Sequence, residues 1–195
     1  MKDIIKLGGI LFIVTAIAAA ALAMVNSVTK EKIEAQKKQV VENALTIALP
    51  AADKDAIVKT TSDELEYYTG YKTPDKKDVV GYAIVAKGQG YSSEIQTMVG
   101  VDTSGTIIGL TVMQQVETPG LGTKIEEVRY GEEKPWFQVQ FIGRTHENLA
   151  VEQDGGDIKA ITGATISSRA VTNSIRDALK KLGKHIQQTE HDITE

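Results

Sequence analysis

The sequence predicts an α+β fold, an antiparallel β-sheet with packed helices, preceded by one N-terminal transmembrane helix. Residues 7–25 form an uncharged apolar run. Between residues 79 and 114, three segments rich in β-branched side chains follow one another without a helical pattern between them. Apolar residues then repeat at spacings of three and four near the C-terminus, which is typical of an amphipathic helix. Strands grouped ahead of a helix favour this class over a doubly wound nucleotide-binding domain.

The composition and charge of the chain argue against several classes of function. The chain has 195 residues, enough for one sizeable core, and a net charge of -4 with acidic and basic residues interspersed. Without a basic stripe, we expect no nucleic-acid partner. The absence of cysteine excludes disulfides and iron–sulfur ligation, so redox work would need a bound cofactor. The histidines His146, His185 and His191 have no metal-ligand spacing, so we expect no metal site.

The first element, residues 1–28, is predicted to be a transmembrane anchor. Its apolar run from Leu7 to Val25 is about long enough to cross a bilayer. The alternative is a cleaved signal peptide, because Lys2 and Lys6 form a basic start and residues 21–23, Ala-Leu-Ala, resemble a cleavage site. The run exceeds the roughly 7 to 15 residues of the apolar region of a signal peptide, and the chain continues as helix, which favours retention.

Residues 29–50 predict a juxtamembrane amphipathic helix that stops at Pro50. Four lysines after the span outnumber the two before it, so the positive-inside rule alone would place the main domain in the cytoplasm. A signal-anchor with a short basic start commonly exports the rest of the chain. We therefore expect a single-pass protein of the cell (inner) membrane with an extracytoplasmic main domain.

The main domain is expected to span residues 51–187. Strands are predicted at 79–88, 94–102 and 106–114, with a hairpin loop at 102–105. A further strand is expected at 136–142, where Trp136, Gln138 and Gln140 alternate with Phe137, Val139 and Phe141. A helix should begin at Ser168 and pack one face on the sheet. Residues 188–195 would form a charged C-terminal tail.

The segment Thr162-Gly163-Ala164-Thr165 is the first candidate site. It places Thr165 near a helix N-terminus, where free N–H groups and the helix dipole suit a phosphate. Thr162, Ser167 and Ser168 would add hydroxyl donors. The alternative is an ordinary helix cap. A P-loop is excluded by the missing Gly-Lys-Ser/Thr ending, and no G-x-S-x-G elbow supports a hydrolase.

Residues 117–123, Glu-Thr-Pro-Gly-Leu-Gly-Thr, form the second candidate site. Proline and two glycines predict a tight turn after the third strand. Small residues in such a turn would let a planar ring approach the backbone, although an ordinary loop has the same composition.

The two segments together, behind a single N-terminal span, resemble the FMN-binding domain family. Within that family the chain is more similar to the G subunit of the Rnf electron transport complex than to the C subunit of the sodium-translocating NADH:quinone reductase, which is generally longer. The resemblance implies that a flavin transferase uses FAD and magnesium to attach FMN through a phosphoester to Thr165. It also implies that FMN is contacted by a set of neighbouring residues: Thr162, Gly163, Ala164, Ser167, Ser168, Glu117, Thr118, Pro119, Gly120, Leu121 and Gly122.

A third stretch matches the family more loosely. Ser92 and Ser93, after a Gly-rich segment, could lie near the flavin, but a hairpin turn also explains the glycines. The resemblance implies an electron relay, not catalytic by itself, in a membrane complex that couples ferredoxin:NAD electron transfer to Na+ or H+ translocation, with the other membrane subunits as partners.

Three other functions fit the sequence. One is a membrane-tethered binding or assembly module without flavin, in which the hydroxyl cluster only caps a helix. Another is a part of a sodium-pumping NADH:quinone reductase, similar to the C subunit of that enzyme. The third is a stand-alone flavin reductase, although the sequence offers no evident catalytic residue.

Overall fold

The computed structural model describes residues 2–62 and 65–194, and the chain divides after residue 41 into two units. Residues 1 and 195, at the ends of the predicted anchor and tail, lie outside the described residues.

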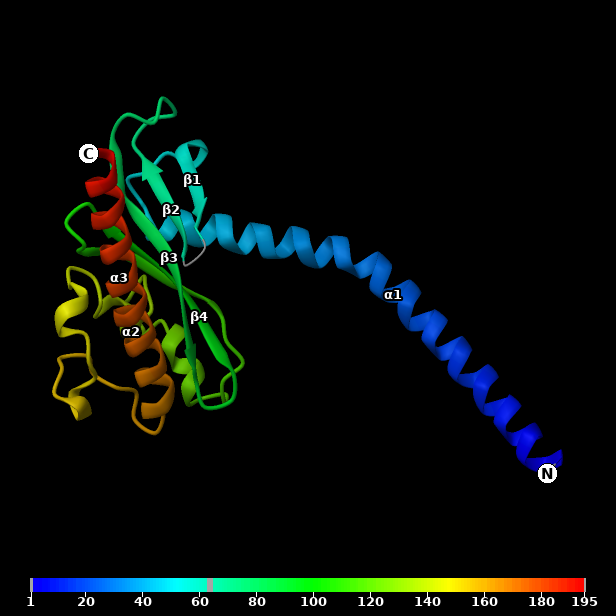
Figure 1. Cartoon of the computed structure of the whole chain (residues 1–195). Coiled ribbons are helices and arrows are strands. Elements are labelled where there is room, and N and C mark those ends of the chain that lie inside the picture. The colour runs from blue at the N-terminus through cyan, green and yellow to red at the C-terminus, as the bar shows by residue number, and fades with distance from the viewer. Residues whose placement is uncertain (1, 63–64, 195) are drawn as a thin grey trace. The chain divides into compact units, whose positions relative to one another are not determined.

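The N-terminal helix α1 is a single element from Lys2 to Ala48 (Figure 1). It runs through the predicted anchor and juxtamembrane helix without a break and ends two residues before Pro50. Its most apolar stretch has a mean hydropathy of 2.4 and is not buried by protein, so this helix is long and apolar enough to cross a membrane. The hydroxyl of Thr15 donates to the carbonyl oxygen of Leu11 at 2.9 Å, which satisfies this polar group within the helix.

The second unit contains a five-stranded antiparallel sheet in which each strand pairs with the next in sequence. The three predicted strands are confirmed. The sequence prediction missed two further strands at the N-terminal edge, which are only five and six residues long. The sheet consists of β1 (Ile57–Thr61), β2 (Glu66–Tyr71), β3 (Val79–Gln89), β4 (Glu94–Asp102) and β5 (Ile107–Gln114).

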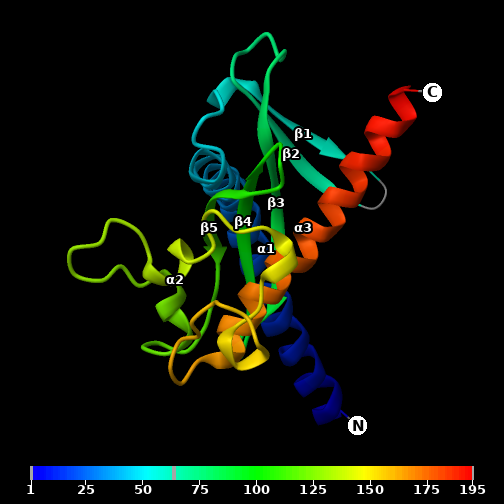
Figure 2. The same cartoon turned by 90° about the vertical axis from the view of Figure 1, so that its left-hand side faces the viewer.

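The C-terminal helix α3, Thr165–Thr194, packs against β3 and β4 on one face of the sheet (Figures 1 and 2). Val171, Ile175 and Leu182 are at most 1% exposed and form the stripe expected from their spacing. The predicted helix start at Ser168 was three residues too late, because Thr165 already has helical geometry. Residues 188–194 continue this helix.

The last turns of α1, from residue 42 onward, pack on the opposite face of the sheet. Val99 and Val101 face the α3 side, so the intervening Gly100 faces away from it. A Cβ atom on Gly100 would lie 2.0 Å from the carbonyl oxygen of Ala48, and one on Gly109 would lie 2.2 Å from that of Ile47. Glycine at both positions therefore allows the helix backbone to contact the sheet directly.

The segment after β5 contains short helical turns: η2 (Gly122–Glu126), α2 (Trp136–Val139), η3 (His146–Asn148) and η4 (Glu152–Asp154). It also pairs with the first residue of β5 at the sheet edge, because the N–H of Gly143 donates to the carbonyl oxygen of Ile107 and the N–H of Ile107 donates to that of Arg144.

The strand predicted at residues 136–142 was wrong, because this segment forms α2 and the turns after it. Phe137 and Phe141 are four residues apart and fully buried, whereas Val139 is 48% exposed. A strand would have placed all three on one face, but one helical turn brings only the two phenylalanines together.

Candidate functional site

A cavity of about 710 Å³ lies where three chain segments meet: the loop between β3 and β4, the segment after β5, and the first turn of α3. Its volume falls in the usual range for small-molecule and cofactor sites. Ten residues line it: Tyr91, Glu117, Thr118, Leu121, Gly122, Gly163, Ala164, Thr165, Ile166 and Ser167.

The turn before α3 presents Thr165 to this cavity. The N–H of Ala164 donates to Ile161 at 2.9 Å, and Gly163 has a left-handed φ of 79°. The hydroxyl of Ser168 accepts from the N–H of Ile161 and donates to the carbonyl oxygen of Ala164, both at 3.0 Å. These bonds close the turn, so that Thr165 is the first residue of the helix.

The helix N-terminus also supplies free donors to the cavity. The N–H of Ser168 bonds to the carbonyl oxygen of Ala164 at 3.0 Å. Among the described residues, no acceptor is bonded to the N–H groups of Thr165, Ile166 and Ser167, as expected for the first turn of a helix. These donors and the helix dipole favour a phosphate at this end of the cavity.

Glu117 joins the three segments. Its Oε2 accepts from the hydroxyl of Ser167 at 2.6 Å and from the N–H of Tyr91 at 3.1 Å. Its Oε1 accepts from the N–H groups of Ser92 and Ser93, both at 3.0 Å, and from the Ser93 hydroxyl at 3.4 Å. The carboxylate is thus bonded by five donors although only 4% of the residue is exposed.

These hydrogen bonds stabilise the ionised form of the Glu117 side chain. Burial by itself would raise the pKa of the carboxyl group. The hydrogen bonds from Ser167 and from the N–H groups of Ser92, Ser93 and Tyr91 outweigh burial and hold the pKa below its ordinary value. Glu117 is therefore an ionised carboxylate at neutral pH.

The Pro-Gly-Leu-Gly segment forms the tight turn that the sequence predicts. Gly120 has a φ of 75°, and its N–H donates to the hydroxyl of Thr123 at 3.0 Å. Leu121 lines the cavity, and its Cδ2 lies 3.1 Å from where a Cβ of Gly163 would stand. A Cβ on Gly122 would lie 2.7 Å from the Ser167 hydroxyl oxygen. The turn therefore approaches the start of α3 closely because of its glycines.

The structure brings most of the predicted site residues to one cavity. Those that line it are Glu117, Thr118, Leu121, Gly122, Gly163, Ala164, Thr165 and Ser167. Pro119, Gly120 and Thr162 do not line it, and Thr162 is exposed. Ser168 is fully buried inside the turn.

Ser167 and Ser168 were predicted to supply hydroxyl donors, and the structure uses both hydroxyls within the protein. The looser expectation that Ser92 and Ser93 lie near the site agrees with their hydrogen bonds to Glu117.

Sequence reasoning missed two residues at the site. Tyr91 is 71% exposed and Ile166 is 52% exposed, and both line the cavity with Leu121. Tyr91 directly follows a Gly-rich stretch and Ile166 directly follows Thr165, and this placement could have indicated that both residues belong to the site. Exposed apolar side chains around a cavity provide a surface that a planar aromatic ring would cover.

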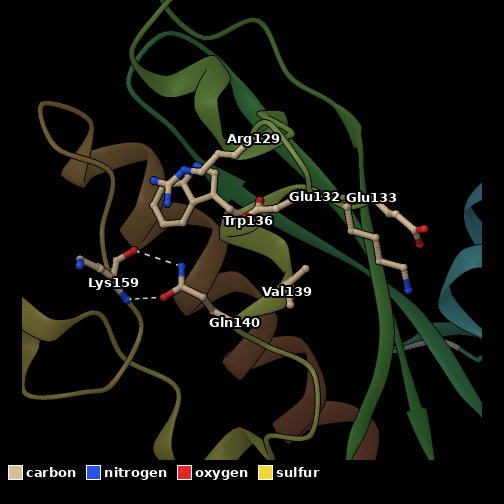
Figure 3. Close-up of a pocket in the computed structure, with 8 residues that line it drawn as sticks. Arg129, Glu132, Glu133, Trp136, Val139, Gln140 and Lys159 are labelled. Atoms are coloured by element: carbon tan, nitrogen blue, oxygen red, sulfur yellow. Dashed lines mark hydrogen bonds between the residues drawn. The ribbon is translucent and has the colours of Figure 1, made fainter.

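A second cavity, of about 630 Å³, lies beside α2 (Figure 3). The guanidinium of Arg129 lies 3.8 Å from the ring centre of Trp136, whose indole N–H donates to Glu127 at 3.1 Å. Gln140 accepts from the N–H of Lys159 at 2.8 Å and donates to its carbonyl oxygen at 3.3 Å. These bonds fix the backbone that leads to the Thr165 turn, so this region supports the first cavity.

Comparisons with known proteins identify the family and the fold of the chain. The FMN-binding domain model matches residues 90–180, and the RnfG N-terminal region matches residues 1–51. A crystal structure of the C subunit of Na(+)-translocating NADH-quinone reductase from Parabacteroides distasonis, 19% identical, covers 76% of this chain and 92% of its own with a TM-score of 0.56. That likeness shows the fold.

Relatives of known identity match nearly the whole chain. The G subunit of the Na(+)-translocating ferredoxin:NAD(+) oxidoreductase complex of Acetobacterium woodii is 34% identical over 92% of this chain and 91% of its own length. The G subunit of the ion-translocating oxidoreductase complex of Escherichia coli is 34% identical over 91% of this chain and 90% of its own. The protein therefore belongs to the family of G subunits of ion-translocating oxidoreductase complexes and contains its FMN-binding domain.

Proposed function

We propose that this chain is the FMN-bearing electron-transfer subunit of a membrane complex that couples electron transfer between ferredoxin and NAD to Na+ or H+ translocation. The family of G subunits supports this function, with the other subunits of the complex as partners. The chain acts as one redox relay and has no catalytic role by itself. FMN bound here supplies the one-electron chemistry that the protein side chains lack.

One observation carries the proposal. Thr165 is at once the first residue of α3 and a lining residue of the cavity that the Pro-Gly-Leu-Gly turn bounds. The free N–H groups of the first turn suit the FMN phosphate, and the exposed apolar side chains of Tyr91, Leu121 and Ile166 suit the ring. The cavity therefore fits both ends of the cofactor.

We further propose that FMN is attached covalently to Thr165 by a flavin transferase. In this transfer a bond forms between the Thr165 hydroxyl oxygen and the FMN phosphorus of FAD. The pyrophosphate bond of FAD breaks, AMP leaves, and the threonine proton is released, with no change in oxidation state. Attachment would retain the cofactor on a membrane face where free FMN is scarce.

The experiment compares the full-length wild type with Thr165→Val after co-expression with a flavin transferase. In-gel flavin fluorescence and an added mass of FMN less one water are expected in the wild type and absent from the variant. Thr103→Val is the matched control, because Thr103 is exposed in the hairpin loop between β4 and β5 and does not line the cavity. An unmodified wild type beside an active transferase would support the tethered module without flavin.

We also propose that α1 anchors the chain in the cell membrane as a single span with the main domain extracytoplasmic. Its apolar, unburied N-terminal part supports the span. Because the chain has no cysteine, a single Thr103→Cys substitution in the exposed hairpin loop gives a unique label site. We expect a membrane-impermeant maleimide to label this cysteine in spheroplasts. Labelling only after permeabilisation would place the domain in the cytoplasm.

A further inference from the structure

Within the described part of the chain, the carboxylate of Glu117 accepts five hydrogen bonds. Three of the donors are backbone N–H groups of the loop between β3 and β4, and two are serine hydroxyls, one of them on the first turn of α3. We propose that Glu117 is a positioning residue, whose ionised carboxylate fixes the loop around Tyr91 to the first turn of α3 and so holds Thr165 ready for flavin attachment. This inference rests on the proposed function.

The site requires a group that accepts hydrogen bonds at both oxygens. Oε1 accepts three bonds and Oε2 accepts two. In Glu117→Gln, one oxygen is replaced by an amide nitrogen, which is itself a donor. Whichever way the amide is turned, at least one backbone N–H loses its acceptor and faces another donor, and a serine hydroxyl has to reverse its direction. Glutamine therefore keeps the shape of the side chain but cannot replace its function.

The surrounding backbone leaves little room for water to take the place of the carboxylate. A Cβ on Gly90 would lie 2.5 Å from Oε1, and a Cβ on Gly122 would lie 2.8 Å from Oε2. Two glycines thus let the backbone of both loops close around Glu117. Because Glu117 is only 4% exposed, donors that lose the carboxylate have little access to a solvent partner.

The position of Ser167 connects this arrangement to Thr165. Ser167 lies two residues after Thr165 in the first turn of α3, and its hydroxyl bond to Glu117 is the shortest of the five. Loss of the carboxylate would free this turn at one end and the Tyr91 loop at the other. The Thr165 hydroxyl and the apolar wall of Tyr91 and Leu121 would then no longer be held around one cavity.

The test measures the initial rate at which purified flavin transferase, with FAD and Mg²⁺, modifies the full-length chain in detergent. For Glu117→Gln we expect a rate at least about tenfold below the wild type, as the loss of charge-assisted bonds implies. Ser167→Ala removes one of the five bonds and should give a smaller loss. Glu147→Gln, at an exposed residue away from the cavity, should keep the wild-type rate.

A second readout separates positioning from general stability. The fluorescence anisotropy of attached flavin reports how firmly the ring is held. It should be lower in Glu117→Gln than in wild type at neutral pH. In loaded wild type it should fall when the pH is lowered enough to protonate Glu117, whereas in the variant this acid step should be absent.

The outcomes distinguish this inference from the proposed function. A wild-type chain that takes up no flavin overturns both. A wild type that is modified, beside a Glu117→Gln variant with equal rate and equal anisotropy, overturns this inference alone. If Glu117→Gln does not fold, Ser167→Ala decides, because an unchanged rate and anisotropy in that folded variant contradict the positioning role.

Discussion

The hydroxyl of Ser167 donates to Oε2 of Glu117 at 2.6 Å, joining two residues that are fifty positions apart in the sequence. A short O–H to carboxylate bond of this kind is charge-assisted and stronger than a bond between neutral groups. Here it ties the first turn of the C-terminal helix to the loop after the sheet. The two sequence motifs of the family thus meet through one hydrogen bond.

Acid should weaken the contribution of Glu117 to stability. Its folded-state pKa lies below the ordinary 4.5, so the contribution is complete above about that pH and is lost as the pH falls through the lower folded-state value. We expect wild type to exceed Glu117→Gln in free energy of unfolding by about 2 kcal/mol at pH 7, and this difference to shrink below pH 4.5. Urea unfolding of both full-length chains in detergent measures it.

The comparison with the variant isolates Glu117 from other acid-sensitive groups. Burial raises the pKa of Asp102, but hydrogen bonds from Ser104, Thr106 and Gly105 lower it overall. Asp102 is present in both chains, so its effect cancels in the difference. A difference that stays constant down to pH 3 would contradict the prediction.

Gly163 should tolerate asparagine better than valine. Its φ of 79° is a conformation that asparagine adopts far more readily than β-branched residues do. Any Cβ there also approaches Leu121 at 3.1 Å. We expect flavin incorporation, measured by in-gel fluorescence, to fall strongly in Gly163→Val and moderately in Gly163→Asn. Equal incorporation in both would show that the left-handed turn is not needed.

Gly100 should be intolerant of a side chain because the end of α1 contacts it. A Cβ there would lie 2.0 Å from the carbonyl oxygen of Ala48, so the helix end must shift. Overpacking of this kind costs about 1–3 kcal/mol, and thermal unfolding of Gly100→Ala should show it. Gly183→Ala is the control, since nothing lies within 4 Å of its Cβ and alanine favours a helix. Unchanged stability in Gly100→Ala would argue against this contact.

Residues 137–141 allow a direct test of helix against strand. The helical turn buries Phe141 completely and leaves Val139 48% exposed. Phe141→Ala should therefore lower the free energy of unfolding by about 3–5 kcal/mol. Val139→Thr should change it by less than about 0.5 kcal/mol. Chemical denaturation measures both, and a large loss at Val139 would favour the strand after all.

Local pattern predicted much of the fold. The three strands from residue 79 onward and the apolar stripe of α3 were found from periodicity because each is long and regular. The short strands β1 and β2 were missed, since five and six residues without regular alternation of apolar and polar side chains give little periodic signal. The helical turn at Trp136 was predicted as a strand because Phe137, Val139 and Phe141 are spaced two residues apart, as on one face of a strand. The two phenylalanines are also four residues apart, which fits a helical turn equally well.

The sequence by itself determined the apolar N-terminal helix, the α+β class and the two segments that resemble an FMN-binding site, since each depends on residues close together in the chain. Only the tertiary structure decided which of those residues share a cavity, how Ser167 and Ser168 use their hydroxyls, and that Glu117 is buried among five donors. The physical reason is that burial, and the direction of a hydrogen bond between distant segments, arise only when the chain brings those segments together.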